Sequence, residues 1–548
     1  MTQRRILIVG GVAGGASCAA RLRRLSEDVE IVMFDRGSYV SFANCGLPYY
    51  VGDVIKEEDN LIIASPELFR QRFNIEVRLH SEVAAIDREG RSIEVRNLAS
   101  GETYSETYDE LVLSPGAKPI RPDIPGIDLP GIFSLRTIPD SRLLRKWIDA
   151  QNATRAVVVG GGYIGMEITE NLLHRDIEVT IVERQSQLMP VVDAEIVTVV
   201  QDSLEENGVD LYLDETVTGF ELEGDRSFNL SLASGGQVKS DLVVLCMGVQ
   251  PENALARQAG LDIGESGGIS VNSQMATNDP HIWAVGDAVE VHNVVTEQST
   301  VMPLAGPANR QGRLAADVIT GRQSAFRGVQ GTSVVGVLDQ VLAFTGPSEK
   351  ELRRLGLWEQ MEKVYLHPGH HAGYYPGSNP ITLKLIFNRQ DGRVVGAQAV
   401  GKGGVDKRID VISMAMQMGA TVFDLEEAEL CYAPQFGSAK DPVNIAGMIA
   451  ANIMRGDVSE AHWETALDGD ALILDVRDPE EYRGGHVEGA QNLPLDQVRD
   501  SLNDLPRDRE ILTYCYVGQR SYYAARALGH YGFKVRNISG GFKTYALR

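Results

Sequence analysis

Two copies of one chain pattern limit the possible folds of this sequence more than any other feature. Each copy is an apolar strand, a glycine-rich turn, a helix and a second strand that ends in an acidic residue. Small turn residues let the backbone approach a pyrophosphate, the helix N-terminus donates N–H groups, and the acid accepts a hydrogen bond from a ribose hydroxyl. The first copy comprises strand Arg5–Val9, turn 10–15, helix Ser17–Ser26, strand Val29–Phe34 and Asp35. The second comprises strand Ala156–Val159, turn 160–165, strand Val179–Val182 and Glu183. The sequence therefore predicts an α/β protein with two dinucleotide-binding domains.

The two copies differ in their turns. Val12 stands where the fingerprint of the first copy would have its middle glycine, whereas the second copy has the full G-x-G-x-x-G pattern. Glu183 favours a ribose with a free 2′-hydroxyl, and hence NADH over NADPH. The alternative is that Glu183 is only a solvated strand end.

Further segments fit an enzyme that binds two dinucleotides. Residues 111–116 and 242–248 are apolar strands that end in glycine turns, as expected where a chain crosses between nucleotide domains. Asp287 follows another short apolar strand and is placed to hydrogen-bond the ribityl chain of FAD. Residues 330–450 mix strands with helices and predict an α+β domain. Its expected elements are strands Ile381–Phe387 and Arg393–Ala399 and helices Asp406–Met418 and Asp441–Met454.

Composition restricts the partners and the compartment. The 548 residues are enough for several domains, and the formal net charge of −23 argues against a nucleic-acid or anionic-membrane partner. No apolar run is long enough for a signal peptide or a membrane span, so we expect a cytoplasmic protein. Five cysteines, far apart and odd in number, argue against a disulfide framework and leave thiol chemistry open. We expect no metal site.

Cys45 is a candidate redox thiol. The nearest other cysteines in sequence are Cys18 and Cys246, so it has no local disulfide partner. Its position just after the first nucleotide-binding unit suits a thiolate that reacts with a small-molecule thiol and is reduced by a flavin. The alternative is an inert, half-buried cysteine. We expect Cys18 and Cys246 to be core residues in a helix and a strand.

A second candidate thiol lies in a separate C-terminal unit that follows a linker at 456–461. Cys515 begins a short loop between strand Ile511–Tyr514 and helix Tyr522–Leu528. Loop N–H groups and the helix dipole both favour a thiolate there. Arg520 is placed to hold an anionic sulfur substrate, and we interpret His486 as structural.

The order of these motifs resembles the pyridine nucleotide-disulfide oxidoreductase superfamily over about residues 4–450, and the C-terminal unit resembles a single rhodanese domain. The second resemblance rests on the Cys515 loop together with residues 474–477 and 485–490, and implies that Cys515 carries a persulfide held by Gly518, Arg520 and Ser521. The implied domains are an FAD domain (1–115 and 251–325) interrupted by an NAD domain (116–250), a dimerisation domain (326–455) and a rhodanese domain (462–548).

The motif at 41–49 resembles the single-cysteine branch of the superfamily, which includes NADH oxidases, NADH peroxidases and coenzyme A-disulfide reductases. Oxidases and peroxidases use a histidine beside the cysteine, whereas the coenzyme A enzymes use tyrosines as acids. Tyr432 and Tyr374 match the tyrosine-bearing form, with Tyr375 as a rival to Tyr374. The alternative for Tyr432 is interface packing.

The resemblance also implies ligand-binding residues. Those for FAD are Gly10, Val12, Ala13, Gly14, Asp35, Arg36, Asn44, Val83, Ser114, Gly116, Asp287 and Ala305. Those for NAD are Gly160, Gly162, Tyr163, Ile164, Gly165, Glu183 and Gly248. Those for coenzyme A are Ser17, Arg21, Arg24, Ser41, Asn44 and Lys440. Ser17, Arg21 and Arg24 share one helix face by spacing, for which the alternative is a solvated basic surface. The family's histidine near Asn309 and its lysine near Phe73 are absent.

The expected protein is therefore a homodimeric FAD enzyme that uses NADH to reduce coenzyme A persulfide or polysulfide to sulfide through Cys45. Cys515 is expected to carry or deliver the sulfur. Three alternatives stay open: a coenzyme A-disulfide reductase, an NADH oxidase or peroxidase, and a sulfur-carrier or sensor protein.

Overall fold

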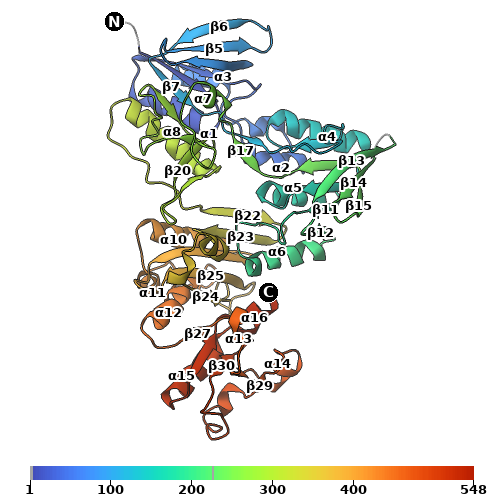
Figure 1. Cartoon of the computed structure of the whole chain (residues 1–548), viewed down its shortest axis with the longest axis vertical. Coiled ribbons are helices and arrows are strands. Elements are labelled where there is room, and N and C mark those ends of the chain that lie inside the picture. The colour runs from blue at the N-terminus through green and yellow to red at the C-terminus, as the bar shows by residue number, and fades with distance from the viewer. Residues whose placement is uncertain (1–3, 225–226) are drawn as a thin grey trace. The chain divides into compact units, whose positions relative to one another are not determined.

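The computed structural model describes residues 4–224 and 227–548, so residues 1–3 of the expected first domain lie outside the described part (Figure 1). The chain divides into two compact units. The first comprises Met1–Ser186 and Val209–Gln330, and the second comprises Gln187–Gly208 and Gly331–Arg548. Segment 187–208, which we expected to belong to the NAD domain, thus packs with the second unit. None of the helices in these described ranges has both the length and the apolar character needed to cross a bilayer.

A parallel five-stranded sheet forms the centre of the first nucleotide-binding domain. Its strands, in spatial order, are β19 (Ile282–Ala284), β7 (Glu110–Leu113), β1 (Arg4–Val9), β2 (Val29–Phe34) and β3 (Glu76–Arg78). The inner strands are almost wholly apolar because both faces are covered. Helix α1 (Ala13–Leu25) packs along α8 (Ala305–Ile319). Crossovers between neighbouring parallel strands place the strand ends at one edge, which is where a nucleotide binds.

Helix α1 begins four residues before the predicted start at Ser17, so that part of the expected glycine turn is helical. Glycine is needed there for close packing. A Cβ on Gly15 would lie 1.9 Å from the Gly10 carbonyl oxygen, and one on Gly14 would lie 2.9 Å from Ser114 Oγ. The first helical turn therefore lies directly against the preceding turn, which the sequence pattern alone does not distinguish from a longer loop.

A second parallel sheet repeats this arrangement. Its strands, in spatial order, are β12 (Asp210–Tyr212), β11 (Glu178–Val182), β10 (Arg155–Val159), β16 (Leu242–Leu245) and β9 (Ile132–Ser134). Helix α5 (Tyr163–Leu173) follows the glycine turn after β10. Cys246 lies one residue beyond β16 and is partly exposed, so its predicted place within a strand is wrong. Cys18 is fully buried in α1, as predicted.

Smaller sheets complete the first unit. The three-stranded ones are β4 (Ser81–Asp87), β5 (Ser92–Asn97) and β6 (Thr103–Thr107); β13 (Val217–Glu223), β14 (Ser227–Leu232) and β15 (Gln237–Ser240); and β18 (Ile269–Ser270), β20 (Val289–His292) and β21 (Ser299–Val301). The chain crosses between the two nucleotide domains at an antiparallel pair, β8 (Ala117–Pro119) with β17 (Val249–Pro251). This pair begins just after Gly116 and Gly248, as the glycine turns predicted.

The second unit contains an antiparallel sheet between helices. Its strands, in spatial order, are β22 (Ser333–Val337), β23 (Gln340–Thr345), β26 (Val394–Gly401), β25 (Ile381–Asn388) and β24 (Met361–Leu366). The helices that pack on it include α6 (Ala194–Glu206), α10 (Val405–Gln417) and α12 (Pro442–Met454). Every residue of β25 and β26 is buried. Alternate side chains point to opposite faces, so Leu383 and Leu385 join the apolar core while Lys384 points to the other face.

Lys384 and its neighbours form a buried ion cluster in this unit. Its ammonium lies 2.9 Å from Asp193, 2.6 Å from Glu195 and 2.7 Å from Glu349. Lys363 bridges Glu349 (2.8 Å) to Glu464 (2.6 Å). Burial alone would raise the pKa of Glu349, but Lys384 and Lys363 outweigh it and hold this pKa at about 2. The three carboxylates around Lys384 lie close enough together to bind a metal ion, but the ammonium fills the space between them.

The rhodanese-like part of the second unit is a parallel sheet with helices. Its strands, in spatial order, are β27 (Glu460–Ala461), β31 (Val535–Ile538), β30 (Ile511–Tyr514), β28 (Leu472–Asp475) and β29 (Gln491–Asn492). Helix α15 (Gln519–His530) begins three residues before the predicted Tyr522. Gly518, at φ +94°, turns the chain directly from the Cys515 loop into this helix. The last helix is α16 (Gly541–Ala546).

Candidate functional site

The predicted FAD cradle is a tight turn that leaves helix N–H groups free. Gly10 has φ +93°, and a Cβ there would lie 2.0 Å from the Ser114 carbonyl oxygen, so only glycine fits. Val12 is the N-cap of α1 and makes no side-chain cap hydrogen bond. By contrast, Ser65 and Thr137 cap α3 (Pro66–Phe73) and α4 (Ile138–Gln151) with their side chains. The first N–H groups of α1 are therefore available to a phosphate.

The acidic residues at the ends of β2 and β11 have the same geometry. Asp35 accepts hydrogen bonds from the N–H groups of Gly11 (3.0 Å) and Gly37 (2.8 Å). Glu183, which is 9% exposed, accepts from the N–H groups of Gly161 (2.7 Å) and Gln185 (2.8 Å). Burial raises the pKa of Asp35, although the two N–H donors and Arg36 oppose this effect. Each carboxylate thus accepts a hydrogen bond from its own glycine turn. Its oxygens can still accept further hydrogen bonds from the hydroxyl groups of a ribose.

Two polar groups in the first unit fit an FAD molecule beyond its pyrophosphate. Asn44 Oδ1 is buried, and no hydrogen-bond partner for it exists among the described residues. Burial raises the pKa of Asp287, while the Arg136 guanidinium opposes this effect. A buried acceptor without a partner costs free energy, and hydroxyl groups of a bound ligand would satisfy it. The residues present therefore fit the cofactor.

The other predicted nucleotide-binding residues lie around these two turns. Arg36 is mainly exposed, 3.7 Å from Glu252. Gly162 N-caps α5 without a side-chain bond and has open space where a Cβ would be, as a bound pyrophosphate requires. The remainder lie in or beside the elements already described: Ala13 and Gly14 in α1, Val83 in β4, Ser114 and Gly116 after β7, Ala305 in α8, Gly160 after β10, Tyr163, Ile164 and Gly165 in α5, and Gly248 before β17.

Cys45 lies in a short 3-10 helix, Asn44–Gly46, that leads directly into α2 (Leu47–Val51). The residue is exposed, as a thiol that reacts with a small molecule must be. Desolvation raises the pKa of its thiol, and the negative charges of Glu167 and Asp287 add to this effect while Arg136 opposes it. The protein alone therefore disfavours the thiolate. Glu167, on α5, is a residue that sequence reasoning missed, because it lies more than 100 positions away in the chain.

Replacing Glu167 should make Cys45 more reactive in alkaline solution. Burial and the charge of Glu170 raise the pKa of Glu167 to about 7, so it is neutral at pH 6 and mostly ionised at pH 8. Glu167→Gln removes that charge and should lower the pKa of Cys45. In a background with both Cys431→Ser and Cys515→Ser, we expect the rate of alkylation by iodoacetamide to equal that of the unaltered Glu167 protein at pH 6 and to be about threefold higher at pH 8. Glu178→Gln, at an exposed site, is the matched control. If Glu167→Gln and the unaltered protein are alkylated at the same rate at pH 8 as well as at pH 6, this assignment is wrong.

The predicted coenzyme A face of α1 is only partly free. Ser17 hydrogen-bonds Asn309, and the Arg21 guanidinium forms a half-buried ion pair with Asp317 at 2.8 Å. Arg24 is exposed near the helix end, as is Lys440 in the second unit. Ser41 has φ +48°, a left-handed conformation that is uncommon for serine. Arg21 would therefore have to share its charge between Asp317 and a ligand phosphate, which the spacing of the three residues could not predict.

Tyr374 and Tyr432 lie together in the second unit although 58 positions separate them. Their hydroxyl oxygens are 2.6 Å apart, and the residues are 76% and 48% exposed. The hydrogen bond from Tyr374 raises the pKa of Tyr432, which keeps this hydroxyl protonated at neutral pH. The adjacent Tyr375 instead packs edge-on against His371. This arrangement favours Tyr374 over Tyr375 as the partner acid.

Cys515 lies in a loop that donates hydrogen bonds to its sulfur. It is fully buried, and its Sγ accepts from Gly518 N–H at 3.2 Å and from Ser521 Oγ at 3.5 Å. The Phe542 N–H donates to the Cys515 carbonyl at 2.8 Å and fixes the loop against α16. These donors suit a negatively charged sulfur atom. His486 stacks on Tyr482 with ring centroids 3.8 Å apart, as expected for a structural residue.

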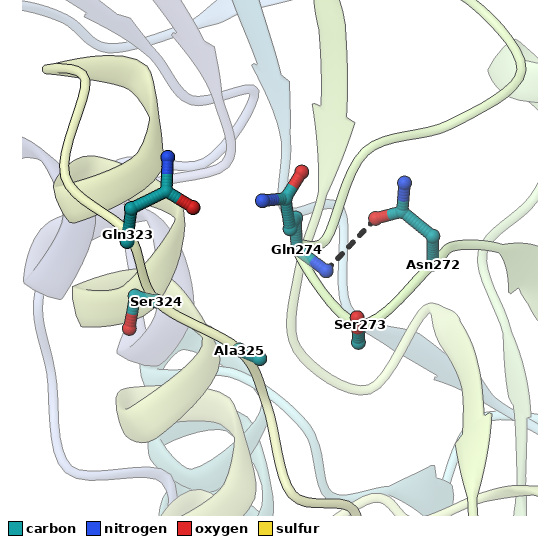
Figure 2. Close-up of a pocket in the computed structure, with 6 residues that line it drawn as sticks. All are labelled: Asn272, Ser273, Gln274, Gln323, Ser324 and Ala325. Atoms are coloured by element: carbon teal, nitrogen blue, oxygen red, sulfur yellow. Dashed lines mark hydrogen bonds between the residues drawn. The ribbon is translucent and has the colours of Figure 1, made fainter.

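Figure 2 shows a pocket in the first unit that contains none of these groups. It is open and polar, and the one hydrogen bond drawn in it joins Gln274 N–H to Asn272 Oδ1 at 2.8 Å. Its lining residues are Asn272, Ser273, Gln274, Gln323, Ser324 and Ala325. It has neither a charged side chain nor a thiol, and we assign it no chemistry.

A flavin cradle, a second dinucleotide cradle and an exposed thiol define a nicotinamide-dependent flavoprotein oxidoreductase. The chain belongs to the pyridine nucleotide-disulphide oxidoreductase family, whose model matches residues 4–312. The dimerisation domain of that family matches residues 332–441, and a rhodanese-like domain matches residues 460–547. These matches confirm the predicted fold class and the family resemblance, and the family implies FAD and NAD(P)H as cofactors.

Three relatives show how far the similarity extends. The structure of reduced Bacillus anthracis CoADR-RHD superposes with a TM-score of 0.97 at 47% identity and covers 100% of this chain and 98% of that chain. The NAD-dependent persulfide reductase of A. fulgidus has a TM-score of 0.91 at 36% identity, with coverage of 99% and 100%. The coenzyme A disulfide reductase of Staphylococcus haemolyticus is 35% identical over 451 residues, which are 82% of this chain and 100% of the relative.

Proposed function

We propose that this protein uses NADH to reduce the sulfane sulfur of coenzyme A persulfide or polysulfide to sulfide, with Cys45 as the reacting thiol and Cys515 as a sulfur carrier. The observation that carries the proposal is the Cys515 loop, whose N–H and hydroxyl donors converge on a buried sulfur. A domain that holds sulfane sulfur has an obvious use beside a persulfide reductase and little use beside a plain disulfide reductase. The similarity to the persulfide reductase of A. fulgidus over 99% of this chain supports the same choice.

The sulfur chemistry at Cys45 is a thiolate exchange. The Cys45 thiolate attacks the inner sulfur of a persulfide R–S–S⁻, the S–S bond breaks, and the outer sulfur leaves with the electron pair and a proton as HS⁻. Cys45 is then joined to R–S in a mixed disulfide. FAD, which the Gly10 turn, Asp35 and the N-terminus of α1 would hold, would pass two electrons from NADH to this disulfide. With one proton, the electrons restore the Cys45 thiolate and release R–SH.

We propose Tyr432, supported by Tyr374, as the acid for the departing sulfur. The short hydrogen bond between the two hydroxyls holds Tyr432 in its protonated form and leaves the pair exposed to solvent. We also propose a homodimer, which the matched dimerisation domain supports, with the tyrosines acting from one side of its interface. We do not assign a role to Cys431, which is exposed beside Tyr432.

Tyr432→Phe should slow the chemical step in which the sulfur departs, without changing the fold. General acid catalysis is worth about 10²- to 10⁴-fold, so we expect kcat for NADH-dependent sulfide release to fall at least about 100-fold. Tyr374→Phe should have a smaller effect, because Tyr432 keeps its proton. Tyr531→Phe, at an exposed position in the rhodanese domain, is the control and should leave kcat unchanged. If kcat is undiminished in Tyr432→Phe, Tyr432 is not the acid, and its role is interface packing.

The cofactor and ligand choices follow from the same residues. Glu183 favours NADH, because its buried carboxylate would repel a 2′-phosphate. Coenzyme A would place its phosphates near Arg21 and Arg24, with Ser17, Ser41, Asn44 and Lys440 as further contacts. We also propose that the protein acts in the cytoplasm.

A coenzyme A-disulfide reductase is the second candidate. The Staphylococcus haemolyticus relative favours it, since that protein matches this chain over 451 residues. However, those residues are 82% of this chain, whereas the persulfide reductase structure covers 99% of it. Release of thiol without sulfide would favour this second candidate. Rapid oxygen uptake with NADH alone would favour an NADH oxidase, and slow NADH turnover with every small thiol substrate would favour a sulfur carrier or sensor.

A further inference from the structure

The charges around the Cys515 loop differ from those expected of a site for a compact anion. Arg520 is the loop's only basic side chain, and it is already bound. Its two terminal nitrogens donate to the two carboxylate oxygens of Glu481, both at 2.7 Å. One of them also lies 3.4 Å from Asp478. A bidentate guanidinium–carboxylate pair fixes the geometry of both partners and neutralises the cation.

Two other basic side chains, Arg477 and Lys543, lie near the loop. Arg477 is buried and bonded to Asp475 at 2.6 Å and to the Gly485 carbonyl at 2.7 Å. Lys543 contacts the loop through its main chain, by an N–H bond to the Tyr516 carbonyl at 2.8 Å. Its ammonium lies close enough to His367 to add, after burial, to the lowering of the pKa of that imidazole to about 3. Three carboxylates and two guanidinium groups therefore surround the loop in paired form.

Two of the exposed side chains beside the loop are aromatic. Tyr516 follows Cys515 directly and is 46% exposed, and Tyr523, on α15, is 48% exposed. Gln519 at the start of that helix donates to the Tyr523 hydroxyl at 3.0 Å. Aromatic rings bind organic groups by burial of apolar surface, which a small inorganic dianion does not offer. The donors left for a sulfur substrate are those that already point at Cys515 Sγ.

We propose that the Cys515 site takes sulfur from persulfides of organic thiols rather than from compact dianions such as thiosulfate, and that Glu481 enforces this choice by neutralising Arg520. The Cys515 thiolate attacks the outer sulfur of R–S–S⁻. The S–S bond of the donor breaks, and R–S⁻ leaves with the electron pair, so that Cys515 carries the persulfide. Thiosulfate would transfer its outer sulfur in the same way and release sulfite, but Arg520, the basic side chain of the loop, is already neutralised by Glu481 and does not balance the second charge.

The test compares two donors without NADH, so that only the Cys515 half is measured. Full-length protein with Cys45→Ser is given thiosulfate or glutathione persulfide, and sulfur transfer from Cys515 to cyanide is followed as thiocyanate. The wild-type rhodanese site should prefer the organic persulfide. Glu481→Gln keeps an acceptor for the Asp478 N–H and removes the charge. It should raise kcat/KM for thiosulfate about tenfold or more, the worth of one hydrogen bond to a charged group. Its kcat/KM for glutathione persulfide should change far less.

Controls separate the possible failures. Glu480→Gln removes the neighbouring exposed charge and should change neither rate, and Arg520→Gln added to Glu481→Gln should abolish the gain. A wild-type site that uses thiosulfate as well as the organic persulfide overturns the inference even if no variant folds. A gain for both donors alike, or for neither, overturns it too. This inference depends on the proposed sulfur-carrying role of Cys515. Thiocyanate formation that persists in Cys515→Ser would refute that role instead.

Discussion

Cys45→Ser should lower NADH-dependent sulfide release at least about a thousandfold, because Cys45 is the one fully exposed thiol among the described residues of the first unit. Serine is close to cysteine in size, but its hydroxyl group cannot form a mixed disulfide. FAD binding should remain, since the cradle is built from the Gly10 turn, Asp35 and the N-terminus of α1. The measurement is sulfide release and NADH oxidation under anaerobic conditions, with bound FAD determined from its absorbance.

Cys431→Ser is the matched control for this result. Cys431 is also an exposed free thiol, and we expect turnover within about twofold of wild type, as for most surface substitutions. Sulfide release that survives in Cys45→Ser but disappears in Cys431→Ser would place the redox thiol beside the tyrosine pair. The account of Cys45 would then be wrong.

Lys384→Met should destabilise the second unit strongly. The substitution leaves Asp193, Glu195 and Glu349 facing one another in a buried space without their shared cation. Removal of one partner from a buried ion cluster costs about 3–5 kcal/mol of free energy of unfolding. Thermal unfolding followed by calorimetry should therefore show a midpoint several degrees lower for this unit. The defect should become smaller as the pH falls from about 4.5 to about 2, because the wild-type protein then loses the stabilisation that goes with the lowered pKa of Glu349.

The control is Lys402→Met. Lys402 forms an exposed ion pair with Asp339, which contributes at most about 1 kcal/mol. Glu349→Gln added to Lys384→Met should recover part of the lost stability, since one of the repelling charges is removed. An unchanged unfolding midpoint in Lys384→Met would show that the cluster contributes nothing to stability.

Local sequence patterns predicted the parts of this protein that depend on neighbours in the chain. Strand Val29–Phe34 has the predicted bounds, and Asp35 and Glu183 lie beside their glycine turns as the fingerprints require. These features follow from residues less than 30 positions apart. The start of α1 was missed, because glycine there serves close packing and looks in sequence like a longer turn.

Contacts between distant segments could not be predicted. Asp317, 296 positions from Arg21, already neutralises the arginine that we expected to bind coenzyme A. Glu481 does the same to Arg520 over 39 positions, and Glu167 acts on Cys45 from another domain. Each of these carboxylates adds a negative charge beside a predicted site residue. The residue types at the sites were therefore predictable, but the charge that a substrate would meet there was not.

The most direct test of the central claim is the amount of sulfide released for each NADH oxidised by the wild-type protein. Coenzyme A persulfide, polysulfide and coenzyme A disulfide are supplied in parallel under anaerobic conditions, with Cys515→Ser measured beside the wild type. We predict one sulfide per NADH with coenzyme A persulfide, and a loss of turnover in Cys515→Ser for only some of the sulfane-sulfur substrates. If only coenzyme A disulfide is turned over and Cys515→Ser changes nothing, the protein is a disulfide reductase joined to a separate sulfurtransferase, and the central claim is wrong.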